Sequence, residues 1–186
     1  TACGSSSKSQ TATDNNAEAL TVDQIIENPD LFVGKTITVD GVCSHLCKHG
    51  GRKAFLLSEG GTALLRCEAT PEMGGAFAKE CIRQPLKVSG ILRENRIDET
   101  TLQQLEQQHA AQMEAMIAQG VENAETTEAA VGCSTEKAAH GQGDLNSFEA
   151  RMADYRAKIA EREKAEGKPY FSDYYIEATS YELLAE

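Results

Sequence analysis

Short apolar-rich segments separated by glycine-containing turns recur through the region 31–96. In the segment 36–42, Ile37 and Val39 alternate with threonines, a pattern typical of a half-buried β-strand. Further strands are predicted at 53–57, 62–67 and 86–92, with a short helix at 77–82 before the last of them. The segment 170–184 alternates again and predicts a fifth strand.

A different period governs the segment 100–168, where apolar residues recur every three to four positions in two stripes. The first stripe is Leu102, Leu105, His109, Met113 and Met116, and the second is Phe148, Met152, Tyr155 and Ile159. Capping-box spacings at Thr21–Gln24, Thr101–Gln104 and Asn146–Glu149 mark three predicted helix starts. Two long helices joined by residues 119–145, which show no strong pattern, predict an antiparallel helical hairpin.

The predicted order is three strands, a short helix, a fourth strand, the helical hairpin and a fifth strand. Five strands with a helix between the third and fourth are in the order of an OB-fold barrel. The segment Gly34–Val42 (Gly-Lys-Thr-Ile-Thr-Val-Asp-Gly-Val) resembles the first strand of OB-fold domains from the bacterial cell envelope. The resemblance covers residues 21–96 and 170–184, and Gly41 predicts a bulge or bend in that strand.

The resemblance implies a mainly β fold with an α insert. The fold would be a five-stranded, OB-like Greek-key barrel with strands within 31–96 and 170–184. The helical insert 100–168 would lie between strands 4 and 5, a connection that often carries a ligand-facing loop in such barrels. If the insert folds over the barrel face, it covers that face.

The charge of the chain excludes some classes of partner. The net charge is -11, although residues 31–96 hold ten basic side chains against six acidic ones. Bulk attraction to nucleic acid or to an anionic membrane is therefore disfavoured. Aromatic residues make up 5% of the chain, and Phe55 is the only one between Phe32 and Phe77. Nucleic-acid binding, which favours aromatic residues among basic ones, is not expected.

The amino terminus, Thr1-Ala2-Cys3-Gly4 followed by a Ser-rich stretch, resembles the end of a bacterial lipoprotein signal. The resemblance implies lipidation of Cys3, a tether over 1–19 and a folded domain over 20–186, held outside the cytoplasmic membrane in the bacterial cell envelope. Membrane contact would then come from the lipid alone. The alternative is an ordinary terminus that happens to contain a cysteine.

Cysteine and histidine recur at every second position in the segment 43–49. On a continuous strand these side chains share one face, but Cys43 and His49 would lie about 20 Å apart, too far to bind one ion. A transition metal such as zinc therefore requires a curled barrel that brings together Cys43, Cys47, His49 and Cys67. Two alternatives remain: cysteines buried as small apolar residues, or a structural disulfide from Cys43 or Cys47 to Cys67 or Cys81.

Four basic residues are predicted around the same hairpin: Lys48, Arg52, Lys53 and Arg66. They form a candidate anion-binding rim, although charge on edge strands also deters aggregation, and that second interpretation is favoured. Cys133 and His140 lie between the helices at a spacing typical of no particular site.

The sequence contains no nucleophile–base–acid set, phosphate-binding loop or zincin motif, so no enzyme is expected. The leading hypothesis is a lipid-anchored binding protein whose Cys43–His49 segment presents a metal ion or metal cofactor. The first alternative is a structural or interaction module in which the helical hairpin contacts a protein partner. The second is binding of an oligonucleotide or another anion on the barrel face.

Overall fold

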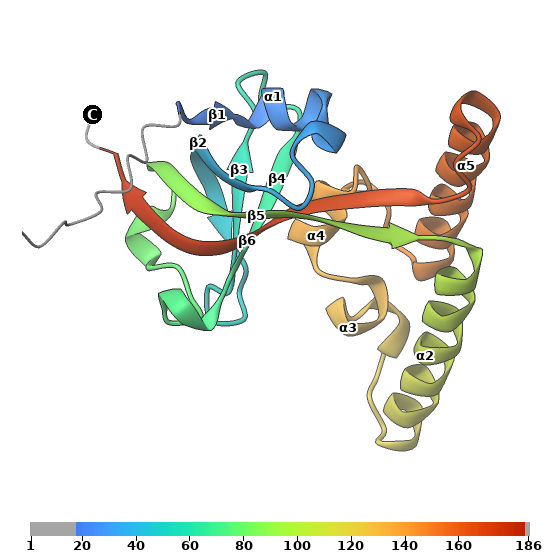
Figure 1. Ribbon diagram of the computed structural model, residues 1–186. Helices are drawn as coiled ribbons and strands as arrows, with labels where there is room; N and C mark the ends of the chain where they lie inside the picture. The colour runs from blue at the N-terminus through green and yellow to red at the C-terminus, as the bar shows by residue number, and fades with distance from the viewer. Residues whose placement is uncertain (1–17, 185–186) are drawn as a thin grey trace, which may run out of the picture.

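Residues 18–184 of the computed structural model form a β-barrel with helices packed to one side (Figure 1). The barrel strands are β2 (Thr36–Leu46), β3 (Lys53–Leu57), β4 (Leu64–Ala69), β5 (Pro85–Ile97) and β6 (Phe171–Leu183). A two-residue strand, β1 (Leu20–Thr21), pairs parallel to β2 and was not expected from the sequence. The five predicted strands are confirmed.

The pairing of the strands closes the barrel. The strand β2 pairs antiparallel with both β3 and β5, and β6 pairs antiparallel with β5. The strand β4 pairs antiparallel with β3 but parallel with β6, so the sheet is mixed. A closed, mixed, five-stranded barrel is consistent with an OB-like fold.

Apolar side chains from all five strands fill the interior of the barrel. Val22 and Ile25 join this core from α1 (Val22–Glu27), whose start is the predicted capping box of Thr21 and Gln24. Gly41 pairs in regular register, so no bulge occurs there. A Cβ on Gly41 would lie 3.0 Å from Val22 Cγ2, so the glycine allows α1 to pack closely on β2.

The irregularity in β2 lies a little further along, where the register shifts between Cys43 and His45. A shift of one residue reverses the face to which the following side chains point. Cys43 is fully buried in the barrel interior, whereas His45 stacks on Phe55 on the outer face. The alternating Cys/His segment is therefore divided between two faces.

The insert between β5 and β6 contains α2 (Glu99–Ala118), α3 (Glu128–Val131), α4 (Ser134–Ala139) and α5 (Phe148–Glu166). Neither long helix begins at its predicted capping box, because Asp98 caps α2 and Ser147 caps α5. A second small core joins α2 and α5 to the end of β5 through Ile97, Leu102, Met152, Tyr155 and Ile159.

Single 3₁₀ turns lie at Pro29–Leu31, Pro71–Met73, Lys79–Cys81 and Ala124–Thr126. The short helix predicted at 77–82 is thus one of these turns. Within residues 18–184, none of the helices is both long enough and apolar enough to cross a bilayer.

Candidate functional site

A row of side chains crosses the outer face of the barrel, one from each strand. Strand register aligns His45, Phe55, Arg66, Tyr175 and Arg93. The ring of His45 stacks on Phe55 with centroids 4.8 Å apart, and the Arg66 guanidinium lies 4.8 Å from the centre of the Tyr175 ring. Phe55 is fully buried and Arg66 is only 6% exposed, so this part of the outer face is covered.

The cover is the segment around α4, which packs on β4 (Figure 1). The Lys53 ammonium donates to Glu136 at 2.5 Å, joining β3 to α4. Burial would raise the pKa of Glu136, but the hydrogen bond and charge of Lys53 outweigh it and the pKa is lowered. Ionised Glu136 therefore helps to hold the insert over the barrel.

Beneath the insert, a buried ion pair links β4 to β6. Two guanidinium nitrogens of Arg66 donate to the two carboxylate oxygens of Asp173, at 3.2 and 2.8 Å. Burial would raise the pKa of Asp173, but the contacts of its carboxylate with His140 and Arg66 lower it overall. Asp173 is therefore a buried carboxylate that stays ionised at neutral pH.

His140, at the end of α4, touches this ion pair. Its Nδ1 is 2.6 Å from the Tyr155 hydroxyl, which can donate to it. Its Nε2 is 3.1 Å from Asp173 Oδ1, but the N–H direction does not meet hydrogen-bond geometry, so the contact is electrostatic. His140 Nε2 is thus a buried nitrogen that lies against the Asp173 carboxylate without a well-aligned hydrogen bond.

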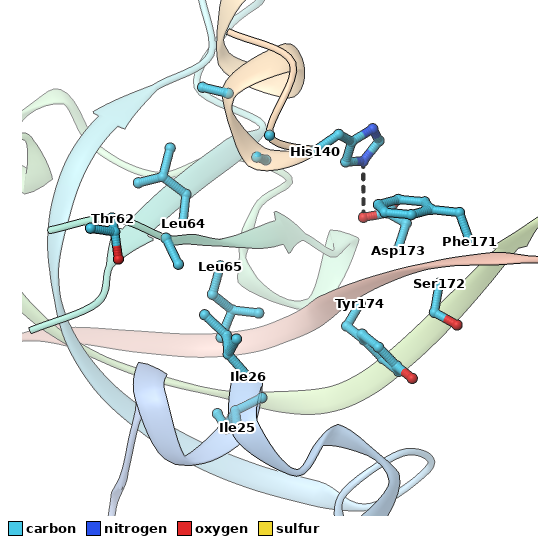
Figure 2. Close-up of a pocket in the computed structure, with 14 residues that line it drawn as sticks. Ile25, Ile26, Thr62, Leu64, Leu65, His140, Phe171, Ser172, Asp173 and Tyr174 are labelled. Atoms are coloured by element: carbon cyan, nitrogen blue, oxygen red, sulfur yellow. Dashed lines mark ion pairs between the residues drawn. The ribbon is translucent and has the colours of Figure 1, made fainter. Parts of the chain in front are cut away.

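A cavity of about 260 Å³ lies where the barrel meets the insert, and we call it the junction cavity (Figure 2). The residues that form it come from α1, from the segment leading into β4, from the end of α4 and from the start of β6. Its walls are mainly apolar and include Ile25, Leu64, Leu65 and Phe171. His140 and Asp173 bring polar atoms to one side, as Figure 2 shows.

The predicted metal residues lie in two separate places. Cys43 and Cys67 are fully buried in the barrel core. Burial raises the pKa of Cys43 to about 11 and also raises that of Cys67, so both thiols are protonated at neutral pH. Cys47 and His49 lie at the turn between β2 and β3, beside a different cavity.

That second cavity, of about 290 Å³, brings Cys47 and His49 next to Cys133 and Glu136 of the insert. Even so, among residues 18–184 no three Cys, His, Asp or Glu side chains are grouped so that they could hold a metal ion. All five cysteines in this part of the chain are free thiols. The metal prediction thus gains no support.

The four basic residues predicted as an anion-binding rim likewise lie in different places. Arg66 is buried against Asp173, and Lys53 is paired with Glu136. Lys48 and Arg52 are exposed near the turn between β2 and β3. Cys3, the predicted lipidation site, lies outside the residues that the structure describes.

Comparison with known proteins adds no function to this geometry. The chain matches no known protein family and no characterised protein. Asp173 was not predicted from the sequence, because the polar residue of an alternating strand is ordinarily solvent-facing. His140 had no predicted role, because its spacing from Cys133 is typical of no particular site. The insert covers Asp173, which is 7% exposed.

Proposed function

We propose that this protein is a non-enzymatic binding protein that takes up a small, mainly apolar molecule in the junction cavity. The observation that carries the proposal is a mainly apolar cavity of about 260 Å³ with the polar residues His140 and Asp173 at one side. Binding sites for small molecules are typically apolar hollows with a few placed polar groups, formed where parts of a fold meet. The polar side of the cavity, formed by His140 and Asp173, would supply orientation, and the apolar walls would supply affinity.

The size and chemistry of the cavity restrict the ligand. A volume of about 260 Å³ is below the range of roughly 300–1,000 Å³ usual for drug-sized ligands, so the ligand is small. Both carboxylate oxygens of Asp173 already contact Arg66, so the carboxylate has little capacity to pair with a cationic ligand. An uncharged ring compound with one polar group fits these restrictions.

The location remains that implied by the amino terminus: lipid anchoring through Cys3 in a bacterial cell envelope. Within an OB-type barrel, the insert would occupy the connection between strands 4 and 5. A ligand held under that insert would be bound at the side of the barrel rather than on an open strand face. The burial of Phe55 and Arg66 argues against oligonucleotide binding on that face.

The test is ligand-observed NMR on the purified chain with indole, p-cresol and cyclohexanol as probes. Ala63→Phe places a ring at the cavity wall, and Ala118→Phe adds the same ring at an exposed position on α2 as its control. We expect saturation transfer to at least one probe, lost in Ala63→Phe and retained in Ala118→Phe. Absence of transfer to all three probes, or equal transfer in both variants, contradicts the proposal.

A second candidate function is a protein-interaction module that uses the helices of the insert. The observation favouring it is the exposed apolar surface at the end of α2, where Ile117 is 66% exposed and Val121, just beyond the helix, is 38% exposed. This function predicts that Ile117→Asp changes the sedimentation behaviour of the protein, alone or with a partner. The cavity proposal predicts no change on this substitution.

A further inference from the structure

A larger hollow lies at the opposite end of β3 from α1, and we call it the turn groove. Its volume is about 480 Å³, and it lies between the turn that links β2 to β3 and the segment 77–82. The junction cavity shares no residue with it. The turn groove is therefore a separate candidate site.

Backbone hydrogen bonds hold the two sides of the turn groove together. Phe77 N donates to Gly51 O at 2.8 Å, and Gly51 N donates to Cys47 O at 3.3 Å. Gly51 has a φ of +67°, and a Cβ there would lie 2.9 Å from Phe77 O. Only glycine allows this close approach without strain, so the shape of the turn groove is set before any ligand binds.

The floor of the turn groove is apolar and its edge is positively charged. Leu46, Phe77 and Ile82 provide apolar surface, and Ile82 is 40% exposed. Lys48 and Lys79 also line it, and both are exposed. No carboxylate of residues 18–184 lies within 4.0 Å of either ammonium group, and no acidic residue lines the turn groove.

Among residues 18–184, the turn groove thus combines two ammonium groups without a carboxylate partner and exposed apolar surface. They complement a ligand that has an anionic head and an aliphatic tail. Inorganic phosphate would leave the apolar floor unused, and a neutral apolar molecule would leave the lysines unused. Stacking of a nucleic-acid base is disfavoured because Phe77, the aromatic residue of the turn groove, is almost fully buried.

We propose that the turn groove binds a free amphipathic anion of the medium-chain fatty acid class. The carboxylate lies between Lys48 and Lys79, and the tail packs on Leu46 and Ile82. The basic rim predicted from the sequence thus contributes Lys48 to this site, whereas Arg66 and Lys53 are used elsewhere. Lys79 also belongs to this site, because the segment 77–82 packs against the turn between β2 and β3.

The test is isothermal titration calorimetry of the whole chain, with three ten-carbon probes below their critical micelle concentrations. Decanoate carries the expected charge, decyl glucoside is neutral and decylamine is cationic. We expect decanoate to bind at least tenfold more tightly than either of the others. Equal affinities for the three probes would overturn the proposal, because the lysines would then have no role.

Two variants locate the binding. Lys48→Glu combined with Lys79→Glu should abolish decanoate binding, and both positions are exposed, so the fold is retained. Lys35→Glu, at an exposed lysine outside the turn groove, is the matched control and should bind normally. Unchanged decanoate binding in the double variant would refute the site.

Two further measurements distinguish the turn groove from the junction cavity and from a lipid surface. Ala63→Phe, which alters the junction cavity, should leave decanoate binding intact, and loss of binding would assign the ligand to that cavity instead. Vesicles of phosphatidylglycerol offer the same chemistry as a lipid surface. Binding to vesicles without binding to free decanoate would overturn the proposal in favour of membrane contact.

Discussion

Asp173→Asn tests whether the buried ion pair holds the barrel and its cover together. The substitution keeps the shape of the side chain but leaves the charge of Arg66 without its buried partner. Breaking one side of a buried pair typically costs about 3–5 kcal/mol of unfolding free energy. Glu68 Oε1 remains 3.2 Å from Arg66 Nε and is more exposed, so we expect the lower end, about 3 kcal/mol.

Urea denaturation at pH 7, followed by circular dichroism, measures this loss. With a denaturant slope of about 2 kcal/mol/M, a loss of about 3 kcal/mol moves the midpoint down by about 1.5 M. The control is the double variant Arg66→Met with Asp173→Leu, which removes both charges and retains apolar volume. Its stability should lie within about 1 kcal/mol of the wild type.

The pH dependence gives an independent check on the same residue. The pKa of Asp173 is lowered in the folded protein, because contacts with His140 and Arg66 outweigh the effect of burial. Its contribution to stability is therefore complete above the unfolded carboxyl pKa of about 3.9 and is lost as the pH falls through the lower folded value. Asp173→Asn should lose less stability than the wild type on acidification below about pH 4.

A stabilising role for the buried ion pair is refuted if Asp173→Asn costs less than about 1 kcal/mol at pH 7. It is also refuted if the double variant is as unstable as the single one. The first result would mean that water or Glu68 compensates the charge of Arg66. The second would mean that packing at this position, rather than charge, determines the stability.

Two substitutions and one labelling experiment test the fold. Gly90→Ala should lower the free energy of unfolding, measured by urea denaturation, by about 3 kcal/mol or more, because the added Cβ would lie only 2.8 Å from a carbonyl carbon of β6. The control, Gly60→Ala, adds a Cβ in open surroundings and should be nearly neutral. Leu102→Ala should cost about 2–5 kcal/mol by the same assay, because Leu102 is fully buried between the insert and the barrel. At pH 8, mass spectrometry should find Cys133 alkylated well before Cys43, because Cys43 is buried and its burial raises its pKa to about 11. Equal alkylation rates at the two thiols would contradict the burial of Cys43.

The strands β2 and β6 could be predicted from sequence because alternation follows directly from burial of one face. The strands β3 and β4 could be predicted because their apolar runs lie between glycine-containing turns. The starts of the two long helices could not be fixed to the residue. The spacing Thr101–Gln104 matches a capping box, yet the side chain of Asp98 accepts from Thr101 N, so α2 begins earlier. Several polar residues near a helix start can compete for the same backbone donors.

The candidate site was beyond sequence reasoning for a different reason. His140 and Asp173 are 33 positions apart, and they meet only because α4 lies over β4 and β6. The bulge after Cys43 likewise has no linear signal, and it separates cysteines that would otherwise share a face. Local sequence patterns indicate the period of one helix or strand, whereas the contact between His140 and Asp173 and the register shift after Cys43 depend on how elements pack against each other.

The longest strands of the barrel, β5 and β6, pair with each other up to the point where the insert begins and ends. Ile97 and Phe171 are direct partners across β5 and β6, so the intervening segment leaves and rejoins the sheet at adjacent points. A two-residue hairpin turn could join the same ends without altering strand order. The insert is thus a topologically replaceable module, and a chain lacking it would expose the aromatic and guanidinium side chains that it now shields from water.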